Sequence, residues 1–140
     1  MKKIFSLLTI AFSFSALAAG NCDLSIWNTE KEKINDAYAN GQIAHQEFFT
    51  LTKRMDKIIS RNVYECVYMG KTADLSKEVI ASSLPLVKAD RAYKIANTTK
   101  LIDFEIKNGS PEGAVKAKID LEKMNAKYNK IETAIAEISK

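Results

Sequence analysis

The chain contains a single histidine, His45, so few side chains could hold a metal ion or serve as the base of a nucleophile. A zinc site needs three or four nitrogen, sulfur or oxygen ligands, and nucleophilic catalysis needs a serine or thiol beside its base. The sequence places no such group beside His45. Carboxylate pairs two residues apart do not share a helical face, as for Glu30 with Glu32 and Asp103 with Glu105. We therefore expect a non-enzymatic protein with no catalytic residue, no metal and no cofactor.

A small-ligand or haem-binding helical bundle stays open as an alternative. Axial haem ligands would have to be His45 and one of three methionines: Met55, Met69 or Met124. Four tyrosines recur within helical segments and could line a ligand site: Tyr64, Tyr68, Tyr93 and Tyr128. Aromatic residues at helical spacing more often fill a core and its rim, and we expect that role for them here.

Basic side chains form a ridge in the middle of the chain, at Lys53, Arg54, Lys57 and Arg61. Residues 51–72 carry five basic and two acidic side chains, whereas residues 22–50 carry two basic and five acidic ones. Neighbours four residues apart share a helical face, so the ridge forms if the segment is helical. Its charge could pair with the acidic segment within the chain. It could instead bind an acidic partner or anionic lipid head groups, and it is our candidate partner-binding ridge.

The amino terminus reads as a secretory signal peptide over residues 1–19. Two lysines precede an apolar run from Ile4 to Leu17, and small residues follow it. The run is shorter than the roughly 20 residues that span a bilayer, so we expect cleavage and no stable membrane insertion. Cleavage removes two lysines and leaves 19 basic and 17 acidic side chains, a balance that gives no case for nucleic-acid binding.

The only two cysteines, Cys22 and Cys66, follow the signal peptide, and an even count in an exported chain predicts one disulfide between them. Two free thiols are the alternative. A lipoprotein is a further one, because Cys22 lies just past the apolar run, although Asn21 stands where lipidation wants a small residue.

Hydrophobic periodicity predicts an all-α fold, an antiparallel up-and-down bundle of three to four helices in a single domain, residues 20–140. The clearest helix starts at Ser110 and Pro111. Its apolar residues are three and four apart, as in a bundle seam: Ala114, Ala117, Leu121, Met124, Tyr128, Ile131, Ile135 and Ile138. Helices are also expected over 22–39, or after coil up to Asn28, and over about 44–69. A hairpin of these two would bring the cysteines together at its open end.

A third helix is expected after Asp74, which would cap it. Its predicted core stripe is Leu75, Val79, Ser82, Leu86, Ala89, Tyr93 and Ala96. Pro85 interrupts the backbone hydrogen bonds of such a helix, so we expect either a kink or a break there, and the continuous stripe favours the kink. Three polar residues at 97–99 predict a second bend.

These observations favour a periplasmic or secreted protein that binds another protein of the cell envelope, as an inhibitor or immunity-type partner does. A periplasmic chaperone or envelope stress protein with an exposed apolar cradle is the second hypothesis. The small-ligand or haem-binding bundle is the third.

Overall fold

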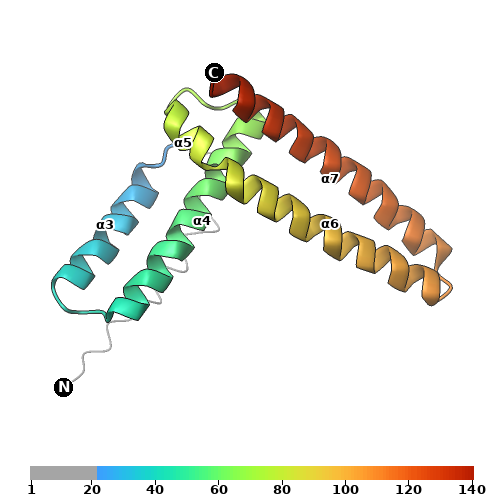
Figure 1. Cartoon of the computed structure of the whole chain (residues 1–140), viewed down its shortest axis with the longest axis horizontal. Coiled ribbons are helices and arrows are strands. Elements are labelled where there is room, and N and C mark those ends of the chain that lie inside the picture. Colours follow the sequence, from blue (N-terminus) through green and yellow to red (C-terminus); the bar gives the residue numbers. More distant parts are fainter. Residues whose placement is uncertain (1–21) are drawn as a thin grey trace.

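The computed structural model describes residues 22–140, and within them the chain is all-α with no strand. The predicted signal peptide, residues 1–19, lies outside the described residues. The helices are α3 (Ser25–Ala39), α4 (His45–Met69), α5 (Lys77–Ser82), α6 (Leu84–Lys107) and α7 (Pro111–Ile138). Successive long helices run in opposite directions along the chain (Figure 1), so the predicted antiparallel up-and-down arrangement is confirmed.

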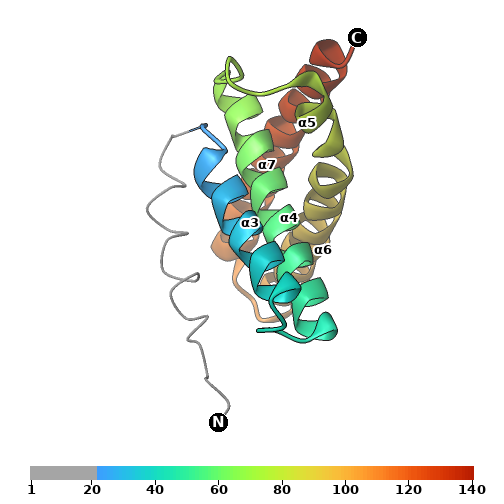
Figure 2. The same cartoon turned by 90° about the vertical axis from the view of Figure 1, so that its left-hand side faces the viewer.

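Two helical hairpins form two arms that meet at an apex and diverge from it (Figure 1). One arm is α3 with α4, and the other is α6 with α7, while the short α5 sits at the apex. α4 joins the arms, because it packs against α3 as well as against α5, α6 and α7. Seen from the side, α3 and α4 stand next to each other in front of the other arm (Figure 2). Both hairpin turns therefore lie at the free ends of the arms.

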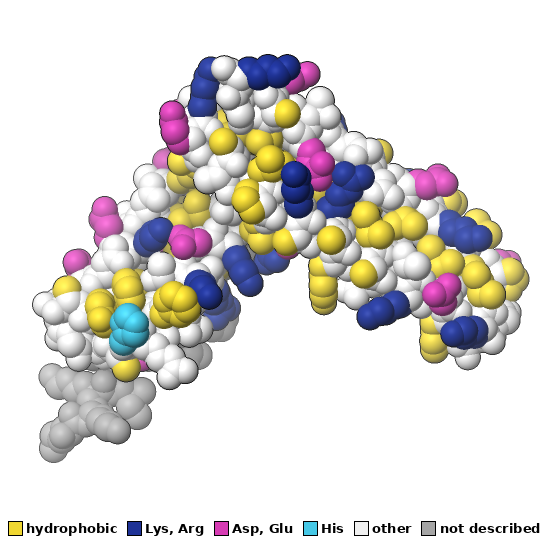
Figure 3. Space-filling view, in the orientation of Figure 1, with side chains coloured by type: hydrophobic (Ala, Val, Ile, Leu, Met, Phe, Trp, Pro, Cys, Tyr) yellow, Lys and Arg dark blue, Asp and Glu magenta, His cyan; other side chains and the backbone are white. Residues whose placement is uncertain are grey.

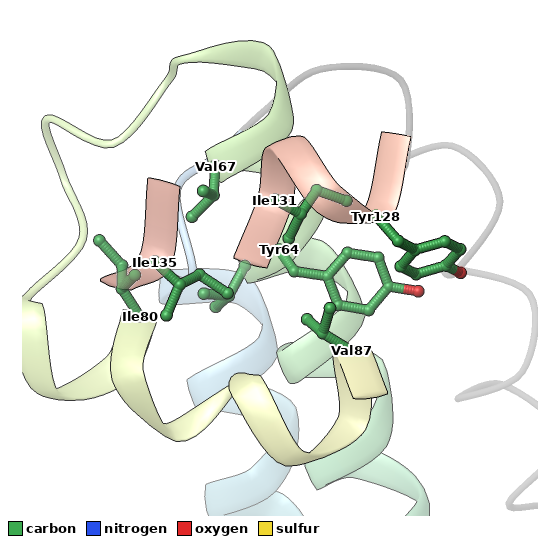
Figure 4. Packing of buried hydrophobic residues seen from close by; sticks show 8 residues of the cluster. Tyr64, Val67, Ile80, Val87, Tyr128, Ile131 and Ile135 are labelled. Carbon is green, nitrogen blue, oxygen red and sulfur yellow. The ribbon is translucent and has the colours of Figure 1, made fainter. Parts of the chain in front are cut away.

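The main hydrophobic core lies at the apex, where four helices contribute side chains to it (Figure 4). Its buried members are Val63, Tyr64 and Val67 of α4, Ile80 of α5, Val87 of α6, and Tyr128, Ile131 and Ile135 of α7. The residues from α7 all belong to the predicted seam of that helix. The seam is confirmed along its whole length, since its other members are buried or half-buried.

The α3–α4 arm has a core of its own, formed by Trp27 and Ile34 of α3 against Met55 of α4. The disulfide between Cys22 and Cys66 ties the start of α3 to the end of α4 at the apex, with 5.9 Å between their Cα atoms. The predicted pairing is confirmed. Because the disulfide uses the thiol of Cys22, the lipoprotein and free-thiol alternatives do not hold.

Helix α3 begins at Ser25, so the alternative of coil up to Asn28 is wrong. The backbone N–H of Ser25 donates to Asp23 Oδ1 at 2.9 Å, and this bond covers one of the free donors in the first turn. Asn28 consequently lies inside the helix, and its own N–H donates to the carbonyl of Leu24.

The third predicted helix is broken in two at Ser83, so the favoured kink is wrong and the break is correct. Ser76, not Asp74, caps α5, since its hydroxyl accepts from the N–H of Val79 at 3.2 Å. Ser83 is fully buried between the two helices and donates to the carbonyl of Ile80 at 2.7 Å. Pro85 falls in the first turn of α6. Backbone N–H groups in a first turn have no acceptor within the helix, so a proline there removes no helical hydrogen bond.

The buried face of α6 lies one to two residues beyond the predicted stripe. Val87 and Ile102 are buried and Ile95 is half-buried, whereas the predicted core residues Ala89, Tyr93 and Ala96 are exposed. Burying branched aliphatic side chains removes more apolar area from water than burying alanines, which explains this choice of face. Figure 1 shows α6 as one continuous helix through residues 97–99, so the predicted second bend gives no break there.

Candidate functional site

The inner faces of the two arms meet at an ion pair between Arg61 of α4 and Asp90 of α6. The guanidinium donates twice, from Nε to Oδ2 and from Nη2 to Oδ1, each at 3.0 Å. The hydroxyl of Tyr64 donates to the same Oδ2 at 2.7 Å. Arg61 is more than half exposed while Asp90 is largely buried, so the pair lies at the edge of the apex core. It marks the side of each arm that faces the other.

The charge of Asp90 is stabilised at this junction. Burial by itself would raise the pKa of the carboxyl, but hydrogen bonds from Arg61 and Tyr64 outweigh burial and lower the pKa below its ordinary value. Burial, together with the bond to Asp90, raises the pKa of Tyr64 well above its ordinary value. At neutral pH the phenol of Tyr64 is therefore protonated and donates its hydrogen bond to an ionised Asp90.

The basic ridge lies on the inner face of α4. Lys57 and Lys53 stand four and eight residues before Arg61, and each step of four turns the helical face by only about 40°. They are exposed, on the side opposite Met55, which packs against α3. Lys53 places its ammonium 4.3 Å from the ring centre of Phe49.

Three of the four predicted ridge residues present their charge to solvent. Within residues 22–140, no ion pair involves Lys53, Arg54 or Lys57, whereas Arg61 is bound to Asp90. The ion pair between α3 and α4 reverses the predicted charges, because its base, Lys31, belongs to α3 and its acid, Asp56, belongs to α4. Lys31 Nζ lies 2.7 Å from Asp56 Oδ1. The acidic side chains of α3 thus do not neutralise Lys53, Arg54 or Lys57.

The inner face of α6 exposes aromatic and aliphatic side chains, together with the polar side chains of Lys94 and Asn97. Tyr93, Leu101 and Phe104 expose 69%, 48% and 60% of their surface. They stand 3, 11 and 14 residues after Asp90, positions that share its face at helical periodicity. Figure 3 shows hydrophobic side chains spread over this arm and Lys or Arg side chains along the inner edge of the other arm. Together these surfaces, a cationic one on α4 and an apolar one on α6, form the candidate site.

The basic residues of the candidate site stand out in the sequence, whereas its apolar residues do not. The sequence pattern places Tyr93 in a core stripe, and Leu101 and Phe104 continue that stripe at steps of eight and three. The signal was therefore present as a second apolar face on one helix. Period alone does not say which of two apolar faces is buried.

The remaining candidate residues do not converge on one site. His45 is exposed at the start of α4, with Nδ1 3.1 Å from the hydroxyl of Tyr38. Of the four tyrosines, Tyr64 and Tyr128 are buried in the apex core while Tyr68 and Tyr93 are exposed. In the part of the chain that the structure describes, no three His, Cys, Asp or Glu side chains are grouped to hold a metal ion.

Comparisons of the chain with protein-family models, with curated proteins and with solved structures find no match. Among the described helices, none combines the length and the apolar character needed to cross a bilayer.

Proposed function

We propose that this protein is an exported, non-enzymatic binding protein that holds a protein partner of the cell envelope between its two arms, as an inhibitor or immunity-type protein does. The observation that supports this most is the pairing of an unneutralised basic face on α4 with an exposed aromatic and aliphatic face on α6. Exposed lysines raise the rate at which an acidic partner arrives, and aromatic side chains supply most of the binding energy once water is excluded.

The two faces specify the chemistry of the partner. A segment that fits them carries carboxylates toward Lys53 and Lys57 and apolar side chains toward Leu101 and Phe104. An amphipathic helix with one acidic edge has this pattern. Export is part of the proposal and depends on the predicted signal peptide.

A charge-reversal experiment tests the proposal. The mature protein is immobilised and exposed to an envelope extract, and retained proteins are identified by mass spectrometry. We expect one stoichiometric partner that elutes at raised salt and is lost with the double variant Lys53→Glu, Lys57→Glu. The control Lys118→Glu, Lys140→Glu makes the same change in net charge at exposed positions outside the inner faces and should retain the partner. Equal loss in both double variants would reduce the effect to net charge and contradict the proposal.

A second candidate, a periplasmic chaperone or envelope stress protein, is favoured by the extent of exposed apolar surface on the α6–α7 arm. Besides the inner face, Ile106, Val115 and Ile119 are about half exposed. A chaperone would suppress aggregation of several unrelated unfolded clients, whereas a dedicated binding protein would not. Replacing Leu101 and Phe104 by glutamine should abolish the activity in either case, so the number of clients decides between the two.

A further inference from the structure

Helix α7 carries a second unpartnered surface, on the side away from the α6–α7 seam. Val115 and Ile119 lie one turn apart there and expose 56% and 46% of their surface. A shallow open hollow runs along them, and α7 alone lines it: Pro111, Glu112, Val115, Lys116, Ile119, Asp120 and Lys123. We refer to these seven residues as the α7 strip. Its partner is indicated by the order of its charges.

Along one edge of the strip the charges alternate as Glu112, Lys116, Asp120 and Lys123, which is negative, positive, negative, positive. Reversing the direction of the helix reverses the order, so an antiparallel copy presents the opposite sign at every position. A parallel copy would present the same sign at every position. The order is therefore complementary to itself only in the antiparallel sense.

The spacing matches as well as the sign. If the two-fold axis crosses α7 at the level of residues 117–118, Glu112 faces Lys123 of the second copy and Lys116 faces its Asp120. The same axis places Val115 against Ile119. These pairings agree in register to within two residues, or about 3 Å at the helical rise, which long side chains can cover.

The four charges are available for such a contact. Five ion pairs form elsewhere within residues 22–140, and none of them uses Glu112, Lys116, Asp120 or Lys123. An interface of this kind is isologous, because each copy contributes the same residues and every pair occurs twice.

We infer that the α7 strip is a self-recognition surface through which two copies of this chain associate antiparallel about a two-fold axis. One strip offers a small apolar centre between charged pairs, so the dimer belongs at the weak end of protein interfaces, and its formation depends on concentration and salt. The inner faces of the arms are not used by this contact.

Sedimentation velocity over a range of protein concentrations at low salt tests the inference. We expect the wild-type protein to pass from monomer to dimer as its concentration rises. Glu112→Lys places lysine opposite Lys123 twice, and Lys123→Glu places glutamate opposite Glu112 twice. Each variant alone should therefore dimerise about tenfold more weakly than the wild type. Circular dichroism checks that these exposed changes leave the helices intact.

Mixing is the decisive arm of the experiment. The Glu112→Lys chain has two lysines at these positions and the Lys123→Glu chain has two glutamates, so an equimolar mixture should form heterodimers. The double variant Glu112→Lys, Lys123→Glu should recover wild-type dimerisation.

Three results would overturn the inference: a wild-type monomer at all concentrations, a dimer unaffected by Glu112→Lys, or a mixture that stays monomeric. A monomer whose strip is needed to retain the envelope partner would also overturn it, and would assign the strip to that partner. The Lys53→Glu, Lys57→Glu variant should dimerise normally, so failure of the dimer and failure of the proposed function can be told apart.

Discussion

The two arms differ in what holds their two helices together. The α3–α4 arm buries large side chains, Trp27, Ile34 and Met55, and is also tied by a disulfide at the apex. In the outer part of the α6–α7 arm, the buried residues are Ile102 and two alanines, Ala114 and Ala117. Alanines let helices approach closely but remove little apolar area from water. Most large apolar side chains in this part of the second arm are consequently on its surface.

This difference suggests a division of labour between the arms. In the α3–α4 arm, a disulfide and a buried core hold α3 against α4, and α4 exposes Lys53 and Lys57. The α6–α7 arm leaves Leu101, Phe104 and Ile119 exposed to solvent, and these are residues of the two interaction surfaces that we propose. The following changes should affect the arms unequally, and they are ordered by expected size.

Removal of the disulfide should have the largest effect on stability. Cys22→Ser frees a cross-link that spans 44 residues of sequence, and the loop-entropy model assigns such a cross-link about 3 to 4 kcal/mol. Urea unfolding followed by circular dichroism should show a lower midpoint. α3 should lose its hydrogen-exchange protection while α6 and α7 retain theirs. Reducing agent should lower the midpoint of the wild type but not that of the variant, and an unchanged wild-type midpoint would show that the disulfide contributes nothing.

Loss of the carboxylate at the junction should come next. Asp90→Ala leaves the buried hydroxyl of Tyr64 without its acceptor and releases Arg61, so unfolding should become easier by about 2 to 3 kcal/mol. The matched control is Asp103→Ala on the same helix, where the aspartate is exposed, and it should change stability by less than about 0.5 kcal/mol. Equal effects from the two variants would mean that Asp90 does not hold the arms together.

The two buried tyrosines of the apex should respond differently to loss of the hydroxyl. Tyr64 donates to Asp90, so Tyr64→Phe should destabilise by about 1 to 2 kcal/mol. The hydroxyl of Tyr128 is buried and has no hydrogen-bond partner among the described residues, so Tyr128→Phe should be neutral or slightly stabilising. Thermal unfolding of both variants makes the comparison. A large loss of stability in Tyr128→Phe would contradict the absence of a hydrogen-bond partner for this hydroxyl.

The pH dependence of stability should be a smaller effect than removal of the Asp90 carboxylate. The pKa of Asp90 is lowered on folding from its ordinary value of 3.8, so its contribution to stability is present above that pH and is lost as pH falls below it. The raised pKa of Tyr64 has the converse effect, since stability should fall as pH rises above 10. Asp90→Asn should flatten the acid limb of the stability curve, and an unchanged slope would contradict the assignment.

Much of the fold could be predicted from the sequence because two kinds of signal agreed. In α7, heptad spacing and bulky residues select the same face, so the seam was predicted correctly. The hairpin of α3 and α4 followed from the turn residues Asn40 and Gly41 and from the similar distances of Cys22 and Cys66 from that turn. Both inferences depend on local geometry alone.

The rest depended on tertiary packing. α6 has two apolar faces, and the sequence pattern favoured the one with Ala89 and Tyr93, while burial selected the one with Val87 and Ile102. The same competition explains why a kink was favoured over the break at Ser83. The ion pair between Arg61 and Asp90 was also unpredictable, because 29 residues separate its partners and only the angle between the arms brings them together.

Site-specific photo-crosslinking tests the binding surface most directly. A photoreactive amino acid is placed singly at Lys57 on the inner face of α4, at Leu101 on the inner face of α6, or at Asn35 on the exposed side of α3. The account predicts that positions 57 and 101 yield adducts of the same mass with one envelope protein, and that position 35 yields none. Adducts at position 35 alone, or different proteins at positions 57 and 101, would contradict a partner held between the arms.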